Sequence, residues 1–272
     1  MEILVASLMA LIVVIAITKL IMKAEKAKEK HAYGKSRALL PKVSVIIPAY
    51  NEIPQVIQKI VDVLAPYVLE VIVVCDGSVR RLPELPGARM VYHLSNYGKG
   101  QALKTGVEAS RGEIIIFLDA DLLNLKLDHI LGLLYGLRPG IMVVGIFRPG
   151  LSFTKIANFM FPILSGTRAF YRKDVEAMFE KIDVSNFGIE IAITACCLIN
   201  GIRTRIVTFS GVSQLLKEQK ADVGKDDAAW ARKRFEQFAR GFRYRMKMYR
   251  EIIGGIAWAI KNRKRLNYRK SA

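Results

Sequence analysis

The chain has 272 residues, of which 52% are hydrophobic and 24% charged. This composition agrees with a folded protein that buries a full core, and it excludes a largely disordered chain. The 42 Lys and Arg outnumber the 24 Asp and Glu, which gives a net charge of +18 and indicates an anionic partner such as nucleic acid, a phosphorylated substrate or anionic lipid. The three cysteines, Cys75, Cys196 and Cys197, have no metal-site spacing, so we expect buried free thiols.

The first 22 residues predict a membrane anchor. Residues 3–22 are apolar apart from Ser7, Thr18 and Lys19, and about 20 helical residues span roughly 30 Å, the thickness of a bilayer core. A cleaved signal peptide is the alternative, but Glu2 and the lack of a small-residue cleavage site argue against it. The segment 19–37 is basic, and basic flanks of membrane helices usually lie on the cytoplasmic side. We therefore expect a single-pass protein of the cell membrane whose remaining residues are cytoplasmic.

A basic linker follows at residues 23–42, and we expect it to be helical at first and broken by Gly34 and Pro41. After the linker, predicted strands alternate with predicted helices. Apolar runs predict strands, and amphipathic stretches predict helices, in the chain order strand 43–47, helix 54–64, strand 69–75, short strand 89–92, helix 100–110 and strand 113–118. The alternation predicts an α/β fold with a mostly parallel sheet covered by helices on both faces. We expect one domain at residues 43–222, with halves 43–124 and 125–222.

Polar residues follow the first, second and fourth predicted strands. They are "PAYNE" at residues 48–52, "DGS" at 76–78 and "DAD" at 119–121. Each alone is more often a helix cap or a turn, but the carboxyl ends of parallel strands meet at one edge, where ligands bind. The like charges of Asp119 and Asp121 then predict a site for Mg²⁺ or Mn²⁺, which prefer oxygen ligands and leave positions for substrate phosphates.

Four stretches together carry a family resemblance: "VSVIIPAYNE", "VIVVCDGS", "NYGKGQALKTGVEASRGEIIIFLDADL" and "LSGTRAFYRKDV". In order and spacing they resemble a family 2 glycosyltransferase of the Rossmann-like GT-A fold, similar to polyprenyl-phosphate sugar synthases, over residues 43 to about 207. The resemblance implies that the base and ribose of a nucleotide sugar are held by Pro48, Tyr50, Glu52 and Asp76. It also implies that Lys99 lies near the nucleotide, and that Asp119 and Asp121 hold ribose and metal, with Asp121 catalytic.

The residues also support these roles separately. Tyr50 offers an aromatic face to a base, Asp76 can accept from a base N–H, and Lys99 can reach phosphate oxygens, although a lysine in a turn is commonly just exposed. The sequence departs from relatives at Cys75, where many have a second aspartate. Leu122, Leu123 and Asn124 follow the Asp pair where related mannose synthases have a glutamine expected at the metal. The Gln-x-x-Arg-Trp motif of processive polysaccharide synthases is absent, which favours the addition of a single sugar over polymerisation.

The second half of the domain supplies the acceptor candidates. A strand is expected at 141–147. Candidates for binding an acceptor phosphate are Arg148, Ser165 and Arg168, and the alternative is that the arginines simply lie on the surface. Glu190 lies near the start of an otherwise apolar helix that ends at Gly201. For a hydroxyl acceptor Glu190 is a candidate general base, whereas an ionised phosphate acceptor needs no base and leaves Glu190 to orient the arginines.

The C-terminal segment 223–272 interleaves basic and aromatic residues at helical spacing. RNA binding is one interpretation, but an amphipathic helical tail on an anionic membrane surface explains the same pattern together with the anchor, so we expect no nucleic-acid partner. The predicted function is transfer of a sugar from a nucleotide diphosphate sugar to a polyprenyl phosphate or other lipid acceptor. The alternatives are a retaining transferase with a small phosphorylated acceptor and an inactive nucleotide-binding membrane scaffold.

Overall fold

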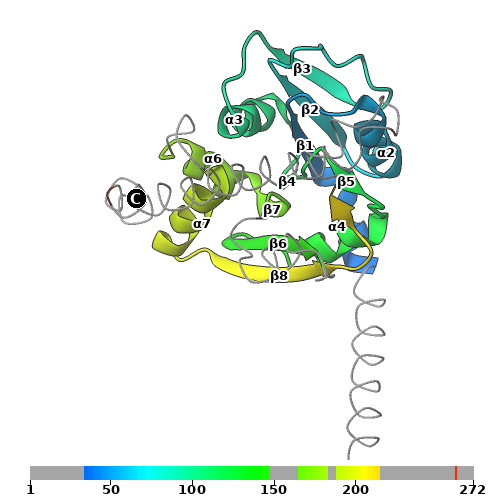
Figure 1. Ribbon diagram of the computed structural model, residues 1–272. Coiled ribbons are helices and arrows are strands. Elements are labelled where there is room, and N and C mark those ends of the chain that lie inside the picture. Colours follow the sequence, from blue (N-terminus) through cyan, green and yellow to red (C-terminus); the bar gives the residue numbers. More distant parts are fainter. Residues whose placement is uncertain (1–33, 148–164, 183–187, 215–260, 262–272) are drawn as a thin grey trace, which may run out of the picture.

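Buried apolar strands form the centre of the protein in a computed structural model that describes residues 34–147, 165–182, 188–214 and 261 (Figure 1). The main sheet has seven strands in the order β3-β2-β1-β4-β7-β6-β8. Their bounds are β1 Val43–Ala49, β2 Glu70–Asp76, β3 Arg89–His93, β4 Ile114–Phe117, β6 Ile141–Phe147, β7 Arg168–Tyr171 and β8 Arg203–Phe209. A second, two-stranded sheet pairs β5 (Leu122–Leu123) with β9 (Ser213–Gln214).

The main sheet is mostly parallel, as predicted. β1 pairs in parallel with β2 and β4, β2 with β3, and β6 with β8. In the described part of this sheet only β7 runs antiparallel, to β4 on one side and to β6 on the other. Burial on both faces explains why β1, β2 and β4 read as nearly continuous apolar runs.

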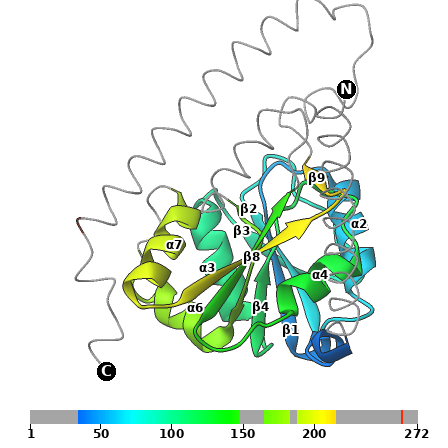
Figure 2. The ribbon, with the colours of Figure 1, turned by 90° about the horizontal axis from the view of Figure 1, so that it is seen from below.

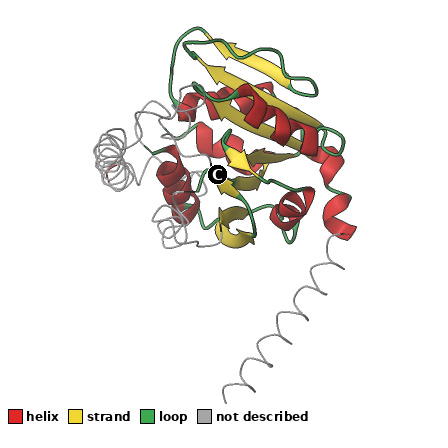
Figure 3. Ribbon diagram, turned by 45° about the vertical axis from the view of Figure 1, so that its right-hand side comes forward, coloured by secondary structure: helices red, strands yellow, loops and turns green. Residues whose placement is uncertain are grey.

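Helices cover both faces of the sheet (Figures 2 and 3). Their bounds are α2 Pro54–Leu64, α3 Lys99–Ala109, α4 Leu127–Leu134, α6 Arg172–Phe179 and α7 Ile189–Ile199. Buried residues of α2 and α4 share one apolar cluster with Val45 and Val73, whereas those of α3, α6 and α7 pack against Ile46 and Ile115 on the opposite face. Neighbouring strand residues thus serve opposite layers, as the pleat requires.

The predicted elements of the first half correspond closely to the observed ones. The helix at 54–64 is confirmed, and the strands and the second helix differ by one or two residues at their ends. Residues 34–37 of the linker are helical, whereas the helix expected before Gly34 lies outside the described residues. Leu40 and Ser36 are buried, so the folded unit includes residues upstream of Val43. The three cysteines are buried, as expected.

Parts of the predicted organisation lie outside the described residues. These are the anchor at 1–22 and nearly all of the tail at 223–272, of which Lys261 alone is described. Within the described ranges, no helix is long and apolar enough to cross a membrane.

Candidate active site

The loops after β1 and β2 are hydrogen-bonded to each other. Asn51 N–H donates to Ser78 Oγ at 3.0 Å, and Val79 N–H donates to Asn51 Oδ1 at 3.0 Å. Asn51 has φ = 53°, a left-handed conformation that asparagine tolerates better than most residues. The expected meeting of "PAYNE" and "DGS" at one sheet edge is confirmed, and Asn51, which the sequence suggested only as a possible cap, makes the connection.

Asp76 holds the loop that leads into α3. His93 Nδ1 lies 2.7 Å from Asp76 Oδ1, and the backbone N–H groups of Tyr97 and Gly98 donate to the two carboxylate oxygens at 2.9 and 2.8 Å. The residue is only 3% exposed. These bonds fix the position of Gly98, the residue that precedes the start of α3 at Lys99. The expected contact between Asp76 and a base stays a prediction, because the described bonds assign its oxygens to the loop.

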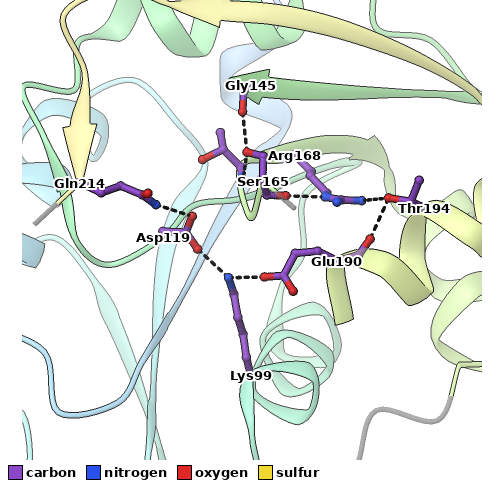
Figure 4. A network of polar contacts seen from close by, with 9 residues as sticks. Lys99, Asp119, Gly145, Ser165, Arg168, Glu190, Thr194 and Gln214 are labelled. Atoms are coloured by element: carbon purple, nitrogen blue, oxygen red, sulfur yellow. Dashed lines mark hydrogen bonds and ion pairs between the residues drawn. The ribbon is translucent and has the colours of Figure 1, made fainter. Parts of the chain in front are cut away.

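Lys99 joins the two halves of the domain. Its Nζ donates to Asp119 Oδ1 and to Glu190 Oε1, both at 2.6 Å (Figure 4). Lys99 opens α3, Asp119 follows β4, and Glu190 lies in the first turn of α7. The side chains are 36%, 15% and 19% exposed, respectively. The three residues were assigned separate roles from the sequence, and the fold brings them into one contact.

The charges of this contact stabilise one another. Burial alone lowers the pKa of the Lys99 ammonium, but the carboxylates of Asp119 and Glu190 outweigh it and raise that pKa above its usual value. Burial alone raises the pKa of Glu190, but the charge and hydrogen bond of Lys99 outweigh it and lower that pKa. At neutral pH Glu190 is therefore a carboxylate and Lys99 an ammonium, so the site holds a cation against Asp119.

Gly166 and Gln214 also lie at Asp119. A Cβ atom on Gly166 would come within 2.3 Å of Asp119 Oδ1 and 2.6 Å of Lys99 Nζ, so only glycine leaves room for this contact. Gln214 Nε2 donates to Asp119 Oδ2 at 3.2 Å. Neither residue was a sequence-based candidate, although Gly166 lies inside the quoted "LSGTRA" stretch and its glycine was a usable signal.

Arg168 and Ser165 are buried beneath this contact. The Arg168 guanidinium donates to Ser165 O at 2.8 Å and to Thr194 Oγ1 at 2.9 Å, and the Thr194 hydroxyl donates to Glu190 O at 2.8 Å (Figure 4). Ser165 Oγ donates to Gly145 O at 2.5 Å. Because Arg168 is 1% exposed, these bonds give it a supporting role at the start of α7. The phosphate contact expected of Arg168 and Ser165 stays a prediction.

The remaining candidates are placed as follows. Tyr50 is 45% exposed just after β1, where its ring is accessible to a ligand. Pro48 and Glu52 are half-buried on either side of it. Arg148 lies outside the described residues.

Asp119 and Asp121 are chemically suited to a hard divalent ion. Both are carboxylates in the segment that follows β4. The Lys99 ammonium group contacts Asp119, which shows that this position accepts a positive charge. Across the described ranges, no group of three or more His, Cys, Asp or Glu is gathered to hold a metal. Magnesium sites in proteins commonly use only one or two carboxylates and keep several positions for water and substrate oxygens.

The family model described as glycosyl transferase family 2 matches residues 44–197, more than half of the chain. The chain belongs to glycosyl transferase family 2. The matched segment contains Lys99, Asp119, Asp121, Arg168 and Glu190, and it ends before Gln214. The resemblance inferred from the four sequence stretches is thereby confirmed at the level of the family.

Curated relatives of this family 2 chain include two named undecaprenyl-phosphate 4-deoxy-4-formamido-L-arabinose transferase. The protein of Serratia proteamaculans (strain 568) is 31% identical over 180 residues, 54% of this chain and 54% of the relative. That of Aeromonas hydrophila subsp. hydrophila is 35% identical over 121 residues, 39% of this chain and 36% of the relative. The chain thus spans about half or less of the length of these curated relatives.

A solved structure shares the fold of this family 2 chain. It is glucosyl-3-phosphoglycerate synthase from Mycobacterium tuberculosis in complex with Mn²⁺, UDP and glucosyl-3-phosphoglycerate. The TM-score is 0.51 at 23% identity, over 72% of this chain and 86% of that chain. At this identity the likeness shows the fold alone, and it confirms the expected GT-A-like α/β architecture.

Proposed function

We propose that the chain transfers a single sugar from a nucleotide diphosphate sugar to a polyprenyl phosphate at the cytoplasmic face of the cell membrane, with Mg²⁺ or Mn²⁺. The observation that carries the proposal is the contact of Lys99 with Asp119 and Glu190, which joins the end of β4 to the start of α7. The donor and acceptor candidates therefore meet at one point, as a transfer between two bound substrates requires. The names of the curated relatives support the choice of a polyprenyl phosphate.

The donor is held by the edge of the sheet that carries β1, β2 and β4. Tyr50 is accessible for stacking on a base, and Lys99 carries the positive charge that a diphosphate requires. Asp119 and Asp121 would hold the metal ion, which when bound would neutralise charge on the departing diphosphate. Lys99 would exchange one of its carboxylate partners for a phosphate oxygen, because its side chain is 36% exposed and within reach.

Glu190 has two possible tasks, and the acceptor decides between them. An acceptor phosphate is already ionised at neutral pH, so no proton need be removed, and the Glu190 carboxylate then serves to hold Lys99. A hydroxyl acceptor would require a general base, and the lowered pKa of Glu190, which Lys99 maintains against the effect of burial, keeps it ionised for that task. The phosphate model is favoured by the curated relatives' names and by the net charge of +18.

The test is an assay of radiolabelled nucleotide sugars with membranes that contain the full chain. We expect label in the organic phase in the presence of Mg²⁺ or Mn²⁺ and none after chelation. An Asp121→Ala chain should lose about 100-fold or more of this activity, because it removes a metal ligand. Label that stays in the aqueous phase would favour the small phosphorylated acceptor, and wild-type activity after full chelation would contradict the metal role.

A further inference from the structure

We infer that Gln214 is a positioning residue of the donor site, and that it orients Asp119 for the metal–diphosphate. The inference rests on the proposed function and deepens it. It starts from the hydrogen bond between Gln214 Nε2 and Asp119 Oδ2, 3.2 Å long, which joins residues 95 positions apart in the chain. The match to the family model ends at residue 197, so Gln214 lies beyond the matched segment.

The two oxygens of Asp119 have different donors. Lys99 Nζ lies at Oδ1 and Gln214 Nε2 at Oδ2 (Figure 4). A carboxylate fixed at both oxygens has its plane defined, whereas one held at a single oxygen can still rotate about its terminal bond. Lys99 is the group we expect to move toward the diphosphate when donor binds. The amide of Gln214 is neutral and does not compete with a metal ion for charge, so it can keep Asp119 oriented throughout.

The backbone places Gln214 directly beside the Asp pair. β9 pairs antiparallel with β5, with Gln214 opposite Leu122, the residue that follows Asp121. Leu122 and Val212 are both buried in the same apolar cluster, which anchors the two short strands. The fold thus brings the Gln214 amide to Asp119 from a segment 95 residues away in the chain.

Helix α4 anchors the turn before β9. His129 Nδ1 accepts from Lys126 N–H at 3.0 Å, so Nε2 carries the proton and donates to Ser210 O at 3.1 Å. The His129 ring also stacks on Phe209, with ring centroids 4.9 Å apart. These contacts fix the chain shortly before Gln214. The amide is therefore held by a rigid support, which a positioning residue needs if it is to restrict its partner.

The experiment compares full-length Gln214→Met with wild type and with Ser213→Ala. Methionine keeps the side-chain length and volume but removes the N–H donor, and Ser213→Ala alters the neighbouring position of β9 without touching the amide. We measure binding of UDP and of GDP by calorimetry, with Mn²⁺ and again with EDTA, together with thermal unfolding and the KM values for donor and acceptor.

We expect Gln214→Met to bind the Mn²⁺–nucleotide about 10-fold more weakly, as for other groups that orient metal ligands. Its binding in EDTA, its unfolding temperature and its acceptor KM should match wild type, as should all properties of Ser213→Ala. If Gln214→Met does not fold, Gln214→Asn, whose shorter amide falls short of Asp119, should show the same weakening.

Three results would overturn the inference, and they can be distinguished from one another. Unchanged Mn²⁺–nucleotide affinity in a variant without the Gln214 amide would refute the positioning role alone, and a lowered unfolding temperature with unchanged affinity would make the contact merely structural. A wild-type chain that binds neither UDP nor GDP with Mn²⁺ would overturn the proposed function, and the inference would fall with it.

Discussion

Gly166 leaves little room for a side chain at the candidate site. A Cβ atom there would lie 2.3 Å from Asp119 Oδ1 and 2.6 Å from Lys99 Nζ, well inside contact distance. Both clashing groups are the ends of side chains, so they can move aside at modest cost. A methyl group at this position would therefore disturb the site more than the fold.

We predict that Gly166→Ala lowers sugar transfer by about 10²-fold, because displacing Asp119 or Lys99 by about 1 Å spoils the geometry of the site. The free energy of unfolding should fall by only about 1–2 kcal/mol, as for a moderately overpacked position. Transfer assays and denaturant titrations measure the two effects. Gly34→Ala is the control, since no atom of the described residues lies within 4 Å of a Cβ there. Near-normal transfer by Gly166→Ala would refute the prediction.

Strand β2 is tied to its neighbours by Glu70, at the opposite edge of the sheet from the site. Its Oε1 accepts from Ser44 Oγ at 2.7 Å and from Arg111 N–H at 2.6 Å. Arg89 and Arg111 lie 3.9 and 3.6 Å from Oε2. One carboxylate, only 8% exposed, thus connects β1, β2, β3 and the turn before β4.

Because of the Glu70 carboxylate, we expect the folded protein to lose stability at acid pH. Burial alone raises its pKa, but the hydrogen bonds from Ser44 and Arg111 and the nearby arginines outweigh burial and lower the pKa below its ordinary value of 4.5. The ionised carboxylate therefore stabilises the protein fully above about pH 4.5, and this contribution is lost as the pH falls through the lowered pKa. We expect Glu70→Gln to cost about 1–2 kcal/mol at pH 7 and progressively less in acid.

Chemical denaturation at a series of pH values between neutral and acid checks this prediction. Glu113→Gln is the matched control, because Glu113 pairs with Lys42 at 3.1 Å but is 63% exposed, and exposed pairs contribute about 0–1 kcal/mol. A Glu70→Gln deficit that stays constant down to pH 3 would show that titration of this carboxylate is not the cause.

The whole molecule combines a folded domain with a large positive charge. The chain has a net charge of +18, an apolar segment at residues 3–22 and a basic segment at residues 223–272. We propose that the first segment anchors the chain and the second binds anionic lipid. Each Lys or Arg near an anionic surface contributes about 1 kcal/mol and is screened by salt, whereas a spanning helix is effectively irreversible.

We predict that the full chain remains with membranes in a wash of about 1 M salt, at which charges are screened within about 3 Å. A truncated chain that begins at Gly34 keeps the buried Ser36 and Leu40 and should bind anionic vesicles only at low salt. Flotation on vesicles with and without anionic lipid measures both. Salt-resistant binding of the truncated chain would show that the first segment is not the anchor.

The first half of the fold could be predicted because its helices and strands are determined by short continuous stretches of the sequence. Helix α2 and strands β1, β2 and β4 follow from apolar periodicity and from the turns between them, and their parallel order places the polar loops at one edge. Strand β7 was not predicted, because its antiparallel place between β4 and β6 depends on partners remote in the chain. The same holds for β5 and β9, which are two residues long and too short to show a period.

By itself, the sequence determined the family, the α/β class, and the candidate residues Lys99, Asp119, Asp121 and Glu190. Only the tertiary structure decided how they are connected: that Lys99 bridges Asp119 and Glu190, and that Gln214 completes the contact. The physical reason is that residue type and spacing reveal what a group can do chemically. Its partners depend on which strand ends and helix starts pack together, and segments 91 and 95 residues apart meet here only because the sheet brings them together.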